Sequence, residues 1–312
     1  MLRILGFQRW RIIHETKGYN ERRETMNRVI LSLKNIDKTY GKEQVLHNIS
    51  FDIEQGEICG LIGENGAGKT TLMRILLGLI RADKGEIKSV SQHKIGSIIE
   101  SPALYPNLTG RQHLQYYKTR FGLKTDITKM LELVHLSEPS WDRKVKNYSL
   151  GMKQRLSIAI ALLDNPELII LDEPVNGLDP QGISDLRKMI LNLRDQLGVT
   201  FLISSHILSE LEFITDKYII MKKGKILNVM SSKELANDLS EKIFLKTSDN
   251  QILKMFLEEE GIVHFEQDDY LVVPEKEKLM AILEYSVVSN LVIQDIYIKK
   301  ERFEDYYLRN II

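Results

Sequence analysis

The feature that most constrains the fold is a glycine-rich segment between an apolar run and a helix-like pattern. Residues 58–62 form a short continuous apolar run, which is typical of a buried strand. Apolar residues at helical spacing follow from Leu72 to Leu79. The segment between them fits G-x-x-x-x-G-K-[ST] and comprises Gly63, Glu64, Asn65, Gly66, Ala67, Gly68, Lys69 and Thr70, followed by Thr71. Glycines let successive backbone N–H groups point into one concavity at a helix N-terminus, so the segment predicts a phosphate-binding loop.

Two side chains of this loop have expected roles toward a nucleotide. Lys69 would bring its charge to the β- and γ-phosphates of ATP, and the Thr70 hydroxyl would ligate Mg²⁺. A second apolar run at 168–171 ends in Asp172 and Glu173, at the strand end where α/β sheets bind ligands. We expect Asp172 to hold Mg²⁺ and Glu173 to act as the general base on the attacking water. An acidic pair can also simply mark a turn.

The order of the apolar runs predicts an α/β fold with a mainly parallel core sheet. Asp179 and Pro180 read as an N-cap and first helical position, and Gly198 as the end of that helix. A strand at 200–203 follows this helix. Two earlier strands, at 29–36 and 45–53, suggest a small antiparallel layer, and residues 102–147 are expected to be mostly helical.

The pattern changes near residue 229, so we expect an ATP-binding domain at 26–228 and an accessory α+β domain at 229–312. The accessory part follows a β-α-β-β-α-β order, typical of a split βαβ fold, with expected elements at 243–246, 252–260, 263–266, 270–273, 279–285 and 291–298. It contains no catalytic constellation. Residues 1–25 are a separate extension, rich in arginine. They are either a basic arm that contacts lipid headgroups or the product of a mis-set start, with Met26 as the first residue.

Composition excludes several classes of protein. Lys and Arg together number 43, as do Asp and Glu, so a neutral chain gives no general field that favours nucleic acid. The lone Cys59 cannot form a disulfide framework, and its apolar neighbours predict a buried thiol. No apolar stretch approaches the ~20 residues that a membrane span needs. Any membrane role must therefore come through a partner.

A third segment, just before the acidic pair, separates the classes of phosphate-loop ATPase. It reads Tyr148, Ser149, Leu150, Gly151, Met152, with Ser149 placed as a helix N-cap. By itself this is a capped helix start. Its position resembles the signature loop of ATP-binding cassette (ABC) proteins, usually written LSGGQ. The first, third and fifth positions depart from that sequence, whereas Ser149 and Gly151, the pair that contacts phosphate in the family, match it.

Three further landmarks of the family follow in the expected places. Tyr40 matches the aromatic residue that stacks on adenine, although alone it could equally be a core or turn aromatic. Asp179 lies in the segment that matches the loop crossing between subunits. His206, 33 residues past Glu173, matches the switch histidine that contacts the γ-phosphate. The resemblance covers residues 28–228 and is specific in its combined order.

The resemblance implies a fold, partners and a location. The fold is that of a P-loop ABC nucleotide-binding domain, with a RecA-like core, a small antiparallel β layer and a helical subdomain. Two cassettes would meet head to tail, so that the signature residues of one act on the ATP of the other. The chain has one copy of each motif, so it must pair with itself or a relative. An integral membrane permease would hold the pair at the cytoplasmic face of the cell membrane.

One departure bears on the cargo. The family usually has glutamine after the strand that precedes the helical region, and this sequence has Glu100 there. Its carboxylate could still ligate Mg²⁺ or hold the water, or it could be a loop acid that faces solvent. A glutamate at this position resembles the ATPases of bacterial exporters for bacitracin and lantibiotics, which confer resistance or self-immunity.

The leading hypothesis is thus an ATPase that powers antimicrobial-peptide export. An exporter ATPase for another drug or a lipid is the main alternative. Soluble ABC ATPases that act on ribosomes or DNA typically carry two cassettes or a long coiled-coil arm, and this sequence shows neither. A regulatory cassette without catalysis is disfavoured by intact Lys69, Asp172, Glu173 and His206.

Overall fold

The computed structural model describes residues 28–89, 95–99, 104–206, 211–239 and 241–300. The expectations for residues 1–25 and for Glu100 lie outside these ranges. The chain divides between Ser231 and Ser232 into two units. In the described ranges, no helix combines the length and the apolar character that crossing a membrane requires.

The first unit is built on a six-stranded sheet in which the strands follow the order β5-β6-β7-β3-β8-β9. Neighbouring strands run parallel except for the pair β8 and β9. Their bounds are β3 Ile58–Ile62, β5 Ile95–Ile98, β6 Leu168–Leu171, β7 Thr200–Ser205, β8 Lys217–Lys222 and β9 Lys225–Ser231. Every residue of β3, β6 and β7 is buried, which explains why β3 and β6 read as continuous apolar runs.

A second, antiparallel sheet has the order β2-β1-β4. It contains β1 Val29–Tyr40, β2 Glu43–Glu54 and β4 Lys84–Ser89. Buried residues of β1 and β2 form one core with Leu72 and Met73 of helix α2, Lys69–Leu76, and with Leu61 of β3. This layer therefore holds the first turn of α2 against the end of β3, where the phosphate loop lies.

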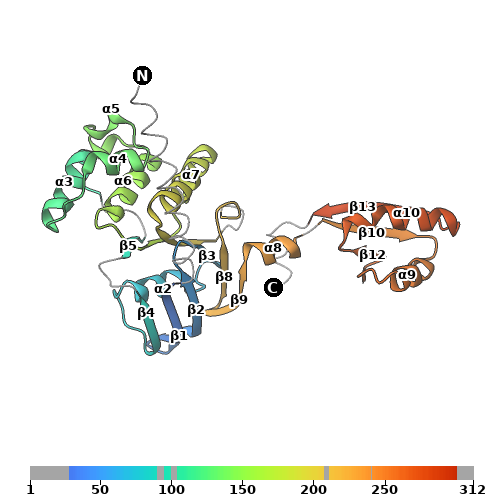
Figure 1. The fold of residues 1–312 in the computed structure, drawn as a ribbon. Helices are drawn as coiled ribbons and strands as arrows, with labels where there is room; N and C mark the ends of the chain where they lie inside the picture. The colour runs from blue at the N-terminus through green and yellow to red at the C-terminus, as the bar shows by residue number, and fades with distance from the viewer. Residues whose placement is uncertain (1–27, 90–94, 100–103, 207–210, 240, 301–312) are drawn as a thin grey trace, which may run out of the picture. The chain divides into compact units, whose positions relative to one another are not determined.

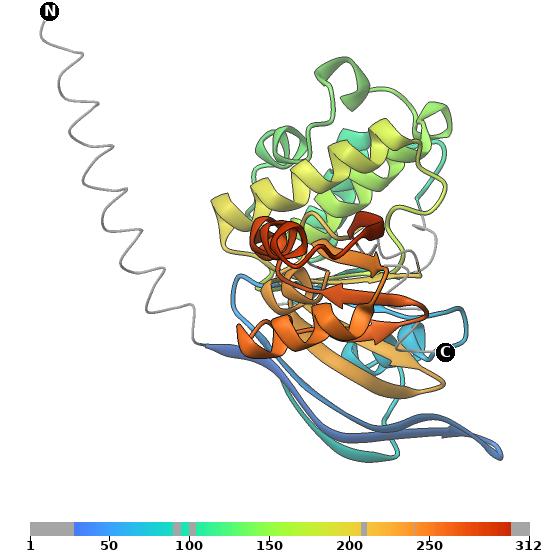
Figure 2. The ribbon, with the colours of Figure 1, turned by 90° about the vertical axis from the view of Figure 1, so that its right-hand side faces the viewer.

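The helical part confirms the predicted caps. Its helices are α3 Gly110–Arg120, α4 Ile127–Leu133, α5 Glu138–Trp141, the short 3₁₀ helix η2 Val145–Asn147, and α6 Leu150–Leu162. Ser149 caps α6, and Asp179 caps α7, Pro180–Leu197, which ends at Gly198 in the left-handed conformation. Figures 1 and 2 place α3 to α6 and the small antiparallel sheet at opposite ends of the first unit.

The second unit has the split βαβ order expected from its sequence. Its elements are α8 Ser232–Asp238, β10 Glu241–Thr247, α9 Asn250–Glu259, β11 Phe265–Gln267, β12 Tyr270–Val273, the 3₁₀ helix η4 Lys276–Lys278, α10 Leu279–Val288 and β13 Ile293–Lys300. The sheet order is β11-β12-β10-β13, with antiparallel neighbours. Leu253 of α9 and Ile282 of α10 share one core with Ile243 of β10. The rings of Phe256 and Tyr285 stack at 3.9 Å and join the two helices.

Candidate active site

The phosphate loop leaves the end of β3 and leads into α2. A side chain at Gly63 would bring its Cβ within 2.5 Å of the Met221 carbonyl oxygen, so only glycine fits there. Gly66 and Gly68 have φ angles of +84° and +100°, a region that favours glycine. At Gly68 a Cβ would also lie 2.7 Å from the side chain of Leu46. These three positions explain the glycines of the motif by backbone conformation and by close approach.

Lys69, the first residue of α2, is 5% exposed and bends back over the loop. Its Nζ donates to the carbonyl oxygens of Gly63 at 2.6 Å and Glu64 at 3.2 Å. It also lies 3.4 Å from Oε1 of Glu173. A buried ammonium requires such partners because desolvation of an unpaired charge is costly. The positive charge is thus held between the loop and the carboxylate that ends β6.

Asp172 stands at the end of β6, beside the first turn of α2. Thr70 Oγ1 donates to Asp172 Oδ2 at 2.8 Å, and Ser204 Oγ donates to Oδ1 at 2.5 Å. The backbone N–H of Asp172 donates to the carbonyl of Ile98 in β5 at 2.8 Å. Two of the three residues predicted as Mg²⁺ ligands, Thr70 and Asp172, are therefore in contact with each other, and the third, Glu100, lies outside the described residues. Ser204, which fixes the second carboxylate oxygen, was not among the predicted residues.

Glu173 follows in a conformation that is uncommon for a residue with a side chain, with φ at +46°. Its backbone N–H donates to Ser204 Oγ at 2.8 Å. Its Oε2 accepts from Asn176 Nδ2 at 2.7 Å and lies 2.9 Å from Nδ1 of His206. Because an ionised carboxylate is only an acceptor, Nδ1 of His206 is the donor in this contact. The structure thus brings Lys69, Glu173 and His206 together.

Tyr40 ends β1 and is 46% exposed, so it is not a core residue. Lys38 Nζ lies 5.4 Å from the centre of its ring and pairs with Asp83 at 2.8 Å. Asp83 also accepts from the backbone N–H of Thr39 at 2.6 Å. These contacts lower the pKa of the Asp83 carboxyl, the Lys38 hydrogen bond first and the Thr39 N–H second. An exposed ring held at a strand end is suited to stacking on a planar base.

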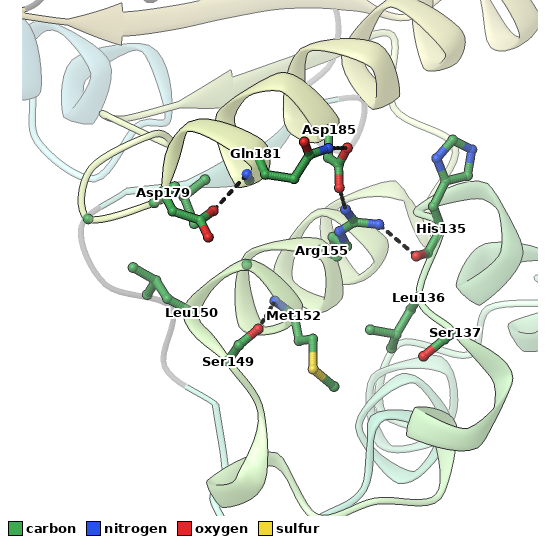
Figure 3. Close-up of a pocket in the computed structure, with 14 residues that line it drawn as sticks. His135, Leu136, Ser137, Ser149, Leu150, Met152, Arg155, Asp179, Gln181 and Asp185 are labelled. Carbon is green, nitrogen blue, oxygen red and sulfur yellow. Dashed lines mark hydrogen bonds and ion pairs between the residues drawn. The ribbon is translucent and has the colours of Figure 1, made fainter.

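The predicted signature residues line a different cavity, of about 500 Å³ (Figure 3). Ser149 Oγ accepts from the backbone N–H of Met152 at 3.2 Å, and Leu150 is 45% exposed. Asp179 Oδ1 accepts from the N–H of Gly182 at 2.8 Å. Residues 63–71 do not line this cavity. One chain therefore presents its phosphate loop and its signature loop at separate places.

An ion pair joins the two helices that frame this cavity. Arg155 of α6 pairs with Asp185 of α7 at 2.8 Å and donates to the carbonyl of His135 at 2.7 Å. Gln181 donates to the other oxygen of Asp185 at 2.8 Å. Figure 3 shows Arg155 reaching from α6, the helix that Ser149 caps, toward Asp185 and Gln181 of α7. The sequence argument did not include this pair, whose members lie 30 residues apart.

The donor set fits magnesium rather than a metal held by protein alone. Within the described residues, no group of three or more His, Cys, Asp or Glu side chains could hold a metal ion. Mg²⁺ usually takes one or two carboxylates, keeps several waters and completes its shell with substrate phosphates. Asp172 and Thr70 supply a carboxylate and a hydroxyl beside the phosphate loop, as such a site requires.

Comparison with known proteins identifies the family. The family model described as ABC transporter matches residues 46–176. The bacitracin transport ATP-binding protein BcrA of Bacillus licheniformis is 39% identical over 253 residues, covering 77% of this chain and 81% of the relative. The chain belongs to the ATP-binding proteins of ABC transporters. The order of motifs had led to this family, and the match confirms it.

Other ABC proteins show the same likeness. The lantibiotic transport ATP-binding protein SrtF of Streptococcus pyogenes is 44% identical over 206 residues, covering 64% of this chain and 89% of SrtF. The linearmycin resistance ATP-binding protein LnrL of Bacillus subtilis is 33% identical over 243 residues, covering 73% and 78%. A solved ATP-binding cassette, dimeric in a post-hydrolysis state with ADP and Pi, is 25% identical with a TM-score of 0.58, covering 65% and 99%. This ABC protein is an ATPase with the predicted P-loop fold.

Proposed function

We propose that this ABC ATPase powers the export of an antimicrobial peptide of the bacitracin or lantibiotic kind, for resistance or self-immunity. The observation that carries the hydrolytic part is the Glu173 carboxylate, which lies 3.4 Å from Lys69 and 2.9 Å from His206. The choice of cargo is supported by two relatives, which are named for bacitracin and for lantibiotic transport.

In the proposed reaction, the chain's own residues bind ATP, orient the reacting groups and accept one proton from water. Loop N–H groups and Lys69 hold the β- and γ-phosphates of ATP, and the exposed ring of Tyr40 stacks on adenine. Glu173 accepts the proton of the attacking water, and His206 holds the Glu173 carboxylate and reaches the γ-phosphate. Asp172 and Thr70 would hold Mg²⁺, which would neutralise charge on the phosphate oxygens when bound.

A complete site requires a second subunit. Ser149, Leu150, Gly151 and Met152 lie at a cavity that the phosphate loop of the same chain does not line. We infer that they close over the ATP of a partner copy or a related ATPase, and that Asp179 lies at the junction between subunits. Closure and reopening of the pair would drive an integral membrane permease from the cytoplasmic face of the membrane. Nucleic acid is not expected as a partner, since the chain is neutral.

Resistance of whole cells tests the cargo. A sensitive host would express the chain together with a candidate permease subunit, and growth would be measured against bacitracin, a lantibiotic and an unrelated cationic detergent. We expect protection from at least one of the two peptides that disappears in the Glu173→Gln variant. Protection from neither peptide would overturn the peptide assignment. The likeness to a linearmycin resistance protein favours another drug as the second candidate in that case.

A further inference from the structure

Asn176 contacts the general base, although no motif assigned it a role. It lies three residues after Glu173, in the loop that leads to Asp179 and α7. Its side-chain Nδ2 donates to Glu173 Oε2 at 2.7 Å, and its backbone N–H donates to the Glu173 carbonyl at 3.2 Å. Since an ionised carboxylate cannot donate, the amide nitrogen of Asn176 must be the atom that faces it. The Asn176 contact is shorter than the contacts of the Glu173 carboxylate with His206, at 2.9 Å, and with Lys69, at 3.4 Å.

The two oxygens of Glu173 differ in their surroundings. Among the residues that the structure describes, Oε2 has two donors at hydrogen-bond distance, Asn176 Nδ2 at 2.7 Å and His206 Nδ1 at 2.9 Å. Oε1 lies 3.4 Å from Lys69 Nζ, beyond the 2.7–2.9 Å that is usual for a charge-assisted hydrogen bond. Oε1 therefore keeps acceptor capacity, and it faces the lysine of the phosphate loop.

We propose that Asn176 is a positioning residue that holds Oε2, together with His206, so that Oε1 is the oxygen that receives the water proton. This inference rests on the proposed role of Glu173. As a water O–H bond breaks, its proton moves to Oε1 and the water oxygen bonds to the γ-phosphorus. The bond from that phosphorus to the β-phosphate oxygen breaks with its electron pair, and ADP and phosphate result. Asn176 exchanges no proton and donates its hydrogen bond throughout.

The local backbone explains why a short amide suits this position. Glu173 has a left-handed φ of +46°, and Gly177 follows Asn176 with φ at +75°. Two backbone hydrogen bonds close the loop: the N–H of Asn176 donates to the carbonyl of Glu173, and the N–H of Leu178 donates to the carbonyl of Val175. The side chain of Asn176 is exposed apart from this contact, so a substitution there changes the hydrogen bond more than the packing.

The test compares three substitutions in the purified full-length chain. Asn176→Asp keeps the shape and places an acceptor where the donor was, Asn176→Ala removes the donor, and Asn176→Gln restores an amide on a longer stem. Asn290→Asp is the matched control, because it makes the same change at an exposed asparagine of the second unit. ATPase kcat and KM, equilibrium binding of a fluorescent ATP analogue and Tm are measured for each.

We expect Asn176→Asp to lower kcat by about tenfold or more, in line with the loss of a hydrogen bond to a charged group. KM, binding of the ATP analogue and Tm should stay near the parent values. Asn176→Gln should turn over faster than Asn176→Ala, and Asn290→Asp should match the parent chain. This pattern would place the effect of Asn176 on the chemical step.

Three results would overturn the inference. In the first, Asn176→Asp and Asn176→Ala both keep the parental kcat. In the second, these variants lose kcat together with Tm or nucleotide affinity. In the third, Asn176→Gln turns over no faster than Asn176→Ala. Glu173→Gln is measured alongside to separate this inference from the proposed function. If Glu173→Gln still turns over at a near-normal rate, the general-base assignment itself fails. If Glu173→Gln is inactive and Asn176→Asp is normal, only the role of Asn176 fails.

Discussion

His206 Nδ1 lies 2.9 Å from Oε2 of Glu173, although 33 residues separate the two in the chain. They meet because β6 and β7 are parallel neighbours, so the residues that follow these strands emerge at the same edge of the sheet. The phosphate loop reaches this edge from β3, the next strand along. The contact between His206 and Glu173 therefore depends on the strand order. The same order places the other oxygen of Glu173, Oε1, 3.4 Å from Nζ of Lys69.

The first prediction concerns this carboxylate. Glu173→Gln keeps the size of the side chain but removes its ability to accept a proton. We expect ATP binding to persist and turnover to fall by about 10²–10⁴-fold, the usual contribution of a general base. Measured kcat and nucleotide affinity of the purified protein check this. A variant that hydrolyses ATP near the parental rate would show that another group takes the proton.

The second prediction concerns magnesium. Asp172→Asn removes the charge that would hold the ion but preserves an acceptor for Thr70, which donates to Oδ2 at 2.8 Å. We expect the Mg²⁺ concentration for half-maximal ATPase activity to rise by at least about tenfold, since even outer-shell changes cost about 10–100-fold in metal affinity. Titration of activity with Mg²⁺ measures it, with Asp164→Asn, at an exposed turn position, as a carboxylate-to-amide control. Equal half-maximal concentrations in Asp172→Asn and the parent would exclude Asp172 as a ligand.

Much of the site could be predicted because its residues follow apolar strands or lie at helix starts. Residues 58–62 and 168–171 were expected as buried strands, and the structure has β3 and β6 at those positions. Parallel packing then places the phosphate loop next to Asp172 and Glu173. Ser149 and Asp179 could be predicted as caps because an N-cap is a local hydrogen bond.

Contacts that depend on side-chain direction between distant elements could not be predicted. Ser204 bridges Asp172 and the backbone of Glu173 only because β7 lies beside β6. Arg155 and Asp185 meet because α6 and α7 pack together. The two serines before His206 on a buried strand mark Ser204 as a polar residue that needs a partner, but they do not indicate which partner. The sequence pattern offered no comparable sign of the contact between Asn176 and Glu173.

The third prediction concerns Glu100, which lies beyond the described residues and follows β5 in the sequence. Because the family usually has glutamine there, Glu100→Gln is expected to alter the coupling of hydrolysis to export more than nucleotide affinity. Resistance of cells to peptide and ATP binding by the purified protein are compared for the variant and the parent. Unchanged resistance would show that the glutamate has no special role.

The last prediction concerns pH and the buried His113 of α3. Its Nε2 accepts the backbone N–H of Tyr105 at 2.8 Å, and its Nδ1–H donates to the carbonyl of Thr109 at 2.9 Å. This arrangement needs the neutral ring, and burial lowers the pKa of His113, although the Thr109 hydrogen bond opposes that shift. The folded state therefore binds fewer protons than the unfolded state. The contribution of His113 to the free energy of unfolding is therefore complete above the unfolded pKa of about 6.5, and it is lost as the pH falls below that value.

His113→Gln tests the assignment, because glutamine can still accept from Tyr105 but does not titrate. We expect the variant to have a lower Tm than the parent at neutral pH, since it fills the buried site less well. Below a pH of about 6.5, its Tm should fall less steeply than that of the parent. Thermal unfolding between mildly acidic and neutral pH measures both slopes, with His264→Gln in the second unit as the control. Parallel slopes for His113→Gln and the parent would place the acid sensitivity in other groups.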